Sequence, residues 1–365
     1  MQANPVVSVL ITTYNRSRLL RRALSSVLKQ TFHDFEIVII DDCSSDDTSQ
    51  VVASFKDSRI RYFQNRANVG SKDGDRPHVR RFLTELMRGE YFAYLCDDDY
   101  WLPPNLLERQ VALFQANPGL AFVFGNQLSY ILSTPESYLE GSPDTTMSFT
   151  WENLGRYFDF ATLTPRTPHL SYDRGIYPKT VMTSEEYLTC FAKNPVLCNR
   201  ADGGSLYSKR CFMAAGAMCA PSGSQWQAGF EFKMGPATAG GVAFLDEPAL
   251  LTEIRHQNAS FMRTQIEHYL DSVKSIEIAL TVPIAEASVD RRKFLQRIKS
   301  KAVRNLTRAY LLNTVTIRRK GSLTMCSREN IAHPVTFRQV LPVYASNRIM
   351  PSLIDLGLLL LAQVA

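Results

Sequence analysis

Short apolar segments alternate with helix-forming segments along residues 1–126. The apolar runs have the length of buried strands, and they lie at residues 6–11, 36–41, 59–63, 91–96 and 120–126. Between them, apolar residues recur with helical spacing at residues 18–29, with Ser17 as the expected N-cap, and around residues 46–55, 78–88 and 104–116. Valine, isoleucine and leucine runs separated by helices are typical of a parallel sheet covered on both faces. The pattern therefore predicts an α/β fold.

Polar motifs follow three of the predicted strands at the points where these strands end. The motifs are Thr12-Thr13-Tyr14-Asn15, Asp41-Asp42 and Asp97-Asp98-Asp99. Ligands of open parallel sheets bind beyond the carboxyl ends of the strands. We therefore expect the three motifs to face one common site.

The three consecutive aspartates admit two interpretations. An acidic turn could cap the helix that is expected to start near Pro104, since helix N-termini favour aspartate. Alternatively, the carboxylates could bind Mg²⁺ or Mn²⁺, hard cations that prefer carboxylate oxygens and share them with substrate phosphates. The acidic pair and the turn with an aromatic residue and hydroxyls at neighbouring strand ends favour a nucleotide site with a metal.

The composition is that of a folded protein without disulfides. Hydrophobic residues make up 45% and charged residues 21% of the 365 residues, which provides apolar material for a full core. The seven cysteines include no CxxC pair, so we expect neither a disulfide framework nor a structural zinc site, and a reducing cytoplasm fits best. We also expect neither a secretory leader nor a spanning helix, because no apolar stretch reaches roughly 18 residues.

The net charge of +6 is concentrated near the C-terminus. Residues 290–350 hold 14 Lys and Arg but 2 acidic residues, a net charge of +12. This distribution does not predict nucleic-acid binding, for which a uniformly basic chain is expected. It predicts basic C-terminal helices that meet an anionic membrane surface; the alternative is that these helices pack on the core or form a homo-oligomer.

Three segments together resemble a known enzyme family. "VSVLITTYNRSRLLRRALSSVLKQTFHDFEIVIIDDCSSDDT", "NVG" at residues 68–70 and "LCDDDYWLPPNLLERQ" are similar to the family-2 glycosyltransferases of the GT-A fold, which use nucleotide-sugar donors. The resemblance extends through residues 1–126. It implies a Rossmann-like, mostly parallel sheet flanked by helices, here with a helical C-terminal extension.

The resemblance also implies a reaction and its location. In inverting transfer, an acceptor hydroxyl displaces the nucleoside diphosphate from the anomeric carbon of the sugar. The expected donor is a UDP-sugar, with GDP- and dTDP-sugars as alternatives, and the expected acceptor is a glycan or a lipid-linked glycan of cell-envelope polysaccharide synthesis. The expected location is cytoplasmic, or peripheral on the inner face of the membrane.

The resemblance further assigns residues to the donor site. Nucleotide binding would fall to Thr12, Thr13, Tyr14, Asn15, Asp41, Asp42, Asn68, Gly70, Asp97 and Asp98. Metal binding, of Mn²⁺ or Mg²⁺, would fall to Asp98, Asp99 and His256.

Two registers of the metal motif stay open. In one, Cys96 takes the place of the motif's first aspartate, and Asp98 and Asp99 lie next to the metal. In the other, Asp97 leads the motif and Tyr100 replaces its last aspartate.

The general base and the acceptor residues are the weakest part of the resemblance. A gap-free reading places Gly229 where the family has its base aspartate, and Glu231, two residues later, is the expected substitute. Asp202, Gly203 and Gly204 resemble the acceptor-side turn, although a tight structural turn also explains the two glycines.

Two other functions remain as alternatives. A catalytically degenerate scaffold that binds nucleotide-sugars is one, because Gly229 cannot act as a base. A nucleotidyltransferase is the other, although the sequence lacks the glycine-rich phosphate loop that such an enzyme needs.

The resemblance and the charge distribution together suggest a domain division. We expect a catalytic domain at residues 1–260, with a nucleotide-sugar-binding half at 1–126 and an acceptor-binding half at 127–260. Residues 261–365 would form the basic helical region.

Overall fold

The structure of the chain is a computed structural model in which part of the sequence can be described. The described residues are 4–70, 77–131, 152, 154–167, 170–173, 175, 177–193, 202–215, 233, 235–254, 296 and 299–300. Glu231 and His256 lie outside them, as does nearly all of the region 261–365. The helical extension, the membrane surface and the homo-oligomer expected of that region therefore stay predictions.

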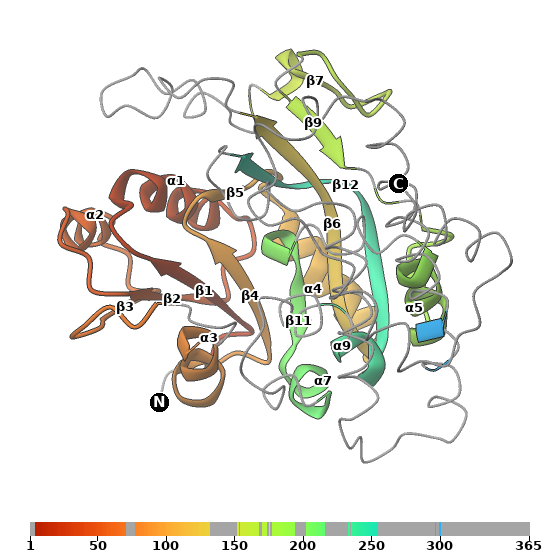
Figure 1. Ribbon diagram of the computed structural model, residues 1–365, viewed down its shortest axis with the longest axis horizontal. Helices are drawn as coiled ribbons and strands as arrows, with labels where there is room; N and C mark the ends of the chain where they lie inside the picture. The colour runs from red at the N-terminus through yellow and green to blue at the C-terminus, as the bar shows by residue number, and fades with distance from the viewer. Residues whose placement is uncertain are drawn as a thin grey trace, which may run out of the picture.

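One large mixed sheet forms the centre of the molecule (Figure 1). Its main path runs through β10 (Val181–Met182), β12 (Gly241–Ile254), β6 (Leu120–Ile131), β11 (Leu206–Ser208), β4 (Tyr91–Cys96), β1 (Val7–Thr13), β2 (Phe35–Asp41) and β3 (Ile60–Gln64). Strands β1 to β4 are mutually parallel, and β6 is parallel to β12. Only β10 and β11 run against their neighbours along this path. The predicted α/β fold with a mostly parallel sheet is confirmed.

Helices connect the first strands at the predicted places. They are α1 (Ser17–Leu28), α2 (Thr48–Ser54), α3 (Pro77–Arg81) with a wider π-type turn (Phe82–Leu86), and α4 (Leu106–Ala116). Three further helices have no counterpart in the predicted pattern: α5 (Ser184–Lys193), α7 (Lys209–Ala214) and α9 (Gly235–Ala239). In Figure 1, α1 and α2 lie beside the red strands at the N-terminal side, and α5 lies beyond the β12 edge. Helix α1 buries Leu20, Ala23, Leu24 and Val27, the apolar positions with helical spacing in the sequence.

Ser17 does not cap α1 as expected. It is the first residue of the helix, and its backbone N–H donates to Oδ2 of Asp46 at 3.0 Å. Asp46 comes from the loop after β2, so a carboxylate distant in sequence satisfies a free N–H of the first turn. The prediction of a local serine cap was wrong for this reason.

The parallel register aligns the ends of three strands. Thr13 of β1 pairs with Asp41 of β2, and Thr12 pairs with Cys96 of β4. All seven residues of β2 are buried. The polar motifs that follow these strands are therefore held at one edge of the sheet.

The second half of the sheet contains elements that the sequence did not predict. β11 inserts antiparallel between β4 and β6, and β5 (Asp99–Trp101) pairs with the far end of β12. Both have three residues, too few for a periodic pattern. β6 also extends beyond its expected end, so the expected boundary at residues 126 and 127 falls inside β6.

A smaller apolar cluster lies at this extension of the sheet. The strand β9 (Leu170–Asp173) pairs with β6, and β7 (Phe158–Asp159) with β8 (Thr164–Pro165) forms a hairpin next to it. The buried members of the cluster are Tyr100, Leu102, Leu128, Leu154, Phe158, Leu170 and Leu251. It includes Tyr100 of β5, the strand that begins with the last residue of the aspartate motif.

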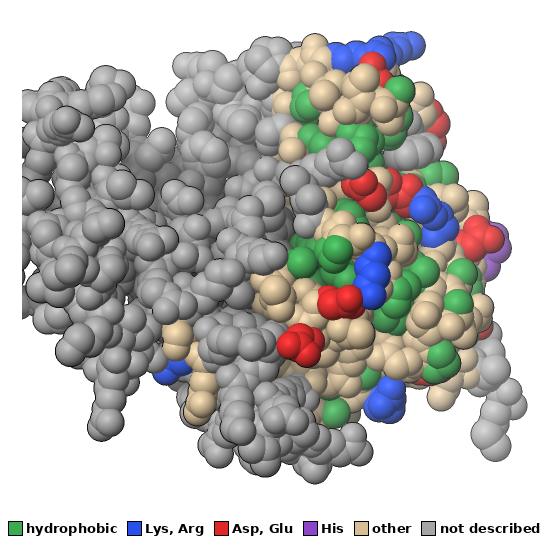
Figure 2. Space-filling view, turned by 90° about the vertical axis from the view of Figure 1, so that its right-hand side faces the viewer, with side chains coloured by type: hydrophobic (Ala, Val, Ile, Leu, Met, Phe, Trp, Pro, Cys, Tyr) green, Lys and Arg blue, Asp and Glu red, His purple; other side chains and the backbone are tan. Residues whose placement is uncertain are grey.

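The described part of one molecular face mixes its charges. Figure 2 shows Lys and Arg side chains beside Asp and Glu, with hydrophobic side chains exposed in small groups. Within the same part of the chain, no helix is both long enough and apolar enough to cross a membrane.

Gly89, in the turn before β4, provides a test of the sheet packing. A Cβ atom at this position would lie 2.7 Å from the backbone nitrogen of Ser8 in β1. We expect Gly89→Ala to lower the free energy of unfolding by about 1–3 kcal/mol, because the backbone of β1 has to move. Denaturant titration of the two proteins measures the difference.

Gly119→Ala is the matched control. A Cβ at Gly119 would meet no described atom within 4 Å. Equal stability losses in the two variants would mean that the close approach to β1 does not matter.

Candidate functional site

The end of β1 and the turn that follows it present the first polar motif. The Thr13 hydroxyl donates to Oδ2 of Asp97 at 2.9 Å, and the Thr12 hydroxyl lies 3.1 Å from the Tyr94 hydroxyl. The Tyr14 side chain is 47% exposed. Asn15 has a φ of 51°, a left-handed conformation that asparagine tolerates. The turn thus directs its hydroxyls toward β4 and leaves an aromatic ring in solvent.

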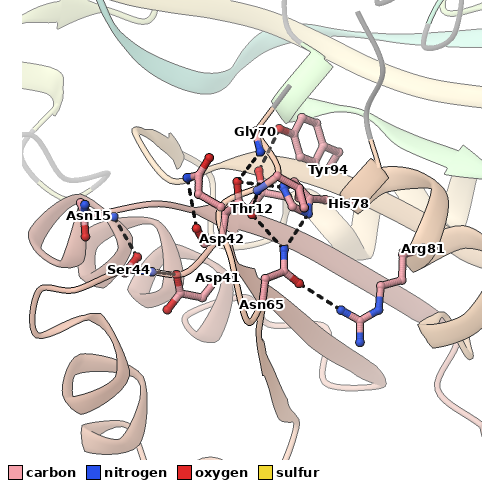
Figure 3. Close-up of polar contacts among 12 residues, drawn as sticks. Thr12, Asn15, Asp41, Asp42, Ser44, Asn65, Gly70, His78, Arg81 and Tyr94 are labelled. Carbon is pink, nitrogen blue, oxygen red and sulfur yellow. Dashed lines mark hydrogen bonds and ion pairs between the residues drawn. The ribbon is translucent and has the colours of Figure 1, made fainter. Parts of the chain in front are cut away.

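Asp41, at the end of β2, is fully buried and accepts two hydrogen bonds. Its Oδ1 accepts from the Ser44 N–H at 2.8 Å, and its Oδ2 accepts from the Tyr62 hydroxyl. Burial and the hydrogen bond to Asp41 raise the pKa of Tyr62 well above its ordinary value. Ser44 also accepts from the Asn15 N–H at 2.8 Å, which links the first two motifs (Figure 3).

Asp42 organises the loop that contains "NVG". Its Oδ1 accepts from the Val69 N–H at 3.0 Å and its Oδ2 from the Gly70 N–H at 2.8 Å, while Asn68 donates to its carbonyl oxygen. Desolvation raises the pKa of Asp42, but the donors from Val69, Asn65 and Gly70 outweigh it and hold this pKa below the ordinary value. Asp42 is therefore an ionised anchor of the loop.

A histidine that the sequence did not single out completes this anchor. His78 Nε2 lies 3.4 Å from Oδ2 of Asp42, and Asn65 Nδ2 donates to Oδ1 of Asp42 at 2.9 Å. Arg81 in turn donates to Asn65 (Figure 3). Asn65 directly follows β3, and His78 and Arg81 belong to α3, so only the tertiary structure brings them together around Asp42.

Asp97 and Asp98 form the tight turn between β4 and β5, and Asp99 is the first residue of β5. Helix α4 begins at Leu106, and its N-cap Asn105 makes no side-chain cap bond. Asp97 and Asp99 are buried, whereas a cap would lie at the helix end. The helix-cap interpretation is therefore wrong.

Arg16, next to the first motif, neutralises part of this turn. Its Nη1 atom donates to Oδ1 of Asp97 at 3.1 Å and to Oδ2 of Asp98 at 3.3 Å. Burial and the neighbouring Asp98 nevertheless raise the pKa of Asp97 to about 6. Arg16 was missed because one arginine after the Thr12–Asn15 motif carries no signal of its own.

Cys96, Asp98 and Asp99 form a candidate metal centre. Each offers one ligand atom, and these atoms lie within 4.8 Å of one another. Asp99 is buried; burial and the Asp98 charge raise its pKa well above the ordinary value, although Thr252 donates to it. Its Oδ1 has no hydrogen-bond partner among the described residues. Carboxylate oxygens with an unsatisfied buried atom fit a divalent cation.

This grouping favours the register in which Cys96 takes the place of the first aspartate. Tyr100, which the other register places at the end of the motif, is buried in the small apolar cluster. The carboxylate of Asp97 instead accepts hydrogen bonds from the Thr13 hydroxyl and from Arg16.

The turn Asp202–Gly204 packs beneath the aspartates. A Cβ at Gly203 would lie 3.0 Å from Oδ2 of Asp99. The carbonyl oxygens of Gly203 and Gly204 accept from Trp101 and Gln110. Both glycines are buried, so their contacts support the tight structural turn; their role toward an acceptor stays a prediction.

A comparison with protein families supports the resemblance. Residues 8–182, just under half of the chain, match the family described as Glycosyl transferase family 2. Over these residues the chain is similar to family-2 glycosyltransferases. Its sheet has the mostly parallel α/β architecture that the resemblance implied.

Two curated bacterial relatives match about a third of this chain. The GalNAc(5)-diNAcBac-PP-undecaprenol beta-1,3-glucosyltransferase of Campylobacter jejuni is 40% identical over 126 residues, which are 34% of this chain and 38% of the relative. The UDP-Glc:alpha-D-GlcNAc-diphosphoundecaprenol beta-1,3-glucosyltransferase WfgD of Escherichia coli is 34% identical over 121 residues, 33% of this chain and 45% of the relative. The chain thus spans less than half the length of these relatives.

Solved structures are similar at lower identity. S. aureus TarS 1-349 in complex with UDP-GlcNAc has a TM-score of 0.47 and 14% identity, with 94% of this chain and 93% of that chain covered. Mannosyltransferase PcManGT from Pyrobaculum calidifontis, in complex with GDP-Man and Mn2+, has a TM-score of 0.45 and 12% identity, with 100% and 81% covered.

The raised pKa of Asp97 predicts a pH-dependent stability of the metal-free protein. The folded pKa of about 6 lies above the ordinary 3.8, so the stabilisation by Asp97 is present at low pH and lost as pH rises through about 6. Asp97→Asn cannot ionise. Between about pH 4.5 and 7.5, we expect the unfolding free energy of the wild type to fall by about 2 kcal/mol relative to this variant.

Denaturant titrations in the presence of a chelator measure this difference. Asp34→Asn, an exposed carboxylate before β2, is the control and should follow the wild type. Parallel curves for wild type and Asp97→Asn would contradict the raised pKa.

Proposed function

We propose that this chain transfers a sugar, with inversion, from a UDP-sugar to a hydroxyl of a lipid-linked glycan. The observation that carries the proposal is the alignment of three polar motifs at the carboxyl ends of β1, β2 and β4. Thr13 and Arg16 contact Asp97, and Asn15 contacts Ser44, so the motifs form one connected surface. The match of residues 8–182 to a glycosyltransferase family supports the reaction class.

The chain's own residues suit a nucleotide on this surface. The exposed ring of Tyr14 can stack on a base. Asp41 is fully buried and paired with Ser44 and Tyr62, so it holds the start of the neighbouring loop in position. The loop held by Asp42 presents Asn68 and Gly70 at the adjacent strand end. These contacts prepare the site before the donor binds, which lowers the ordering cost of binding.

Asp98 and Asp99 are the residues that would hold Mn²⁺ or Mg²⁺. When bound, the cation supplies positive charge against the leaving diphosphate. Arg16 adds a second positive charge, since it already contacts Asp97 and Asp98 at the turn. These positive charges offset the repulsion between the three neighbouring carboxylates, which explains why the chain tolerates them.

The transfer step needs a carboxylate base, and we assign it to Glu231. In this step the acceptor oxygen bonds to the anomeric carbon while its proton passes to the carboxylate. The bond to the nucleoside diphosphate breaks, and the electron pair leaves with the diphosphate. The base contributes typically 10²–10⁴-fold to such a reaction.

The printed names of two relatives support the proposed acceptor class. Both are named as glucosyltransferases whose names contain an undecaprenol-linked diphosphate, and one name contains UDP-Glc. A lipid-linked glycan acceptor and a role in polysaccharide synthesis are the corresponding proposals here.

Asp98→Asn tests the donor site. We expect UDP or a UDP-sugar to raise the melting temperature of the wild type only when Mn²⁺ or Mg²⁺ is present. Loss of an outer-sphere partner of a metal ligand already costs about 10–100-fold, so loss of a ligand should weaken metal-dependent UDP binding at least that much. Isothermal titration with and without chelator gives the affinities.

Asp34→Asn serves again as the control, because it changes the same charge at the opposite end of β2. UDP binding that is independent of metal, or equal in Asp98→Asn and Asp34→Asn, would contradict the metal-dependent donor site.

A catalytically degenerate scaffold is the second candidate, because Gly229 occupies the expected base position. Glu231→Gln separates the two functions. For an enzyme, we expect donor turnover to fall by about 10²–10⁴-fold while UDP affinity is unchanged, because only proton transfer is removed. A wild type that binds UDP but never releases it from a UDP-sugar, with any lipid-linked glycan offered, would favour the scaffold.

A further inference from the structure

The residue that most distinguishes the candidate metal centre is a cysteine. Cys96 is the last residue of β4 and pairs with Thr12 of β1. It lies two residues after Tyr94, so both side chains point to the same face of the strand. The Tyr94 hydroxyl contacts Thr12 in the turn assigned to the nucleotide, which places the Cys96 sulfur on the same side.

The sulfur lies within reach of the two carboxylates that would hold the metal. The ligand atoms of Cys96, Asp98 and Asp99 lie within 4.8 Å of one another, a separation that one ion between them can bridge. Asp99 is 6% exposed, and its Oδ1 has no hydrogen-bond partner in the described part of the chain. A buried oxygen without a partner is costly unless a cation or another donor completes it.

We propose that Cys96 is a thiolate ligand of this metal centre and shifts its selectivity from Mg²⁺ toward softer divalent cations such as Mn²⁺, Co²⁺ and Zn²⁺. The inference rests on the proposed function, because it concerns the same site. Thiolate sulfur is a soft donor, whereas Mg²⁺ prefers hard oxygen ligands and keeps several waters. As the sulfur–metal bond forms, the thiol proton passes to the buffer.

Cobalt provides a direct readout that does not depend on turnover. Co²⁺ is titrated into the full-length protein with and without UDP, and the near-ultraviolet absorption is recorded. A thiolate bound to Co²⁺ gives a charge-transfer band that carboxylate ligands do not give. The variants are Cys96→Ser, Cys96→Asp and the control Cys190→Ser, a half-buried cysteine of α5.

The expected result is a band in the wild type and in Cys190→Ser that is absent in Cys96→Ser and Cys96→Asp. Cys96→Asp restores an all-oxygen site. We therefore expect it to bind UDP with Mg²⁺ about tenfold or more tightly than the wild type, with a smaller change in Mn²⁺.

Two outcomes overturn the inference while leaving the proposed function intact. One is a band that persists in Cys96→Ser; the other is Co²⁺-dependent UDP binding in the wild type without a band. A wild type that binds UDP with no divalent cation at all overturns the proposed donor site as well, so the two failures are distinguishable.

Discussion

The burial of carboxylates at one sheet edge is the constraint on which the rest of the site depends. Asp41, Asp42, Asp97 and Asp99 are all at most 6% exposed. A buried charge is costly unless hydrogen bonds or opposite charges compensate it. Asp41, Asp42 and Asp97 each accept hydrogen bonds from a different strand, turn or loop. Their charges are therefore compensated only when the strand ends come together.

The compensation of the buried charges differs between Asp42, at the loop side of the site, and Asp97 and Asp99, at the candidate metal centre. Around Asp42, two backbone N–H groups and two side chains lower the pKa, so that its charge stabilises a loop. Around Asp97 and Asp99, burial and the neighbouring charge raise the pKa values despite Arg16 and Thr252. The protein's own donors compensate the charge of Asp42, whereas an added cation would stabilise the ionised forms of Asp97 and Asp99 most.

The mixed second half of the sheet holds the aspartate turn in position. Strand β5 begins at Asp99 and pairs with β12, and the Asp202–Gly204 turn packs against Asp99. Trp101 and Gln110 hold the carbonyl oxygens of that turn. Segments that are remote in sequence thus fix the aspartates in position, which is what a preorganised binding site requires.

The sequence by itself determined the parallel α/β core, its helices and the three polar motifs, because buried strands and amphipathic helices have periodic patterns and strand ends follow from them. It also indicated the family, through the residues of those motifs. Only the tertiary structure decided which atoms meet: that Asp46 binds the first turn of α1, and that Arg16 and His78 pair with aspartates. These contacts join residues far apart in the chain, and a single side chain has no periodicity from which they could be predicted. For Cys96, Asp98 and Asp99, which are close in sequence, the structure decided which side chains of the motif gather.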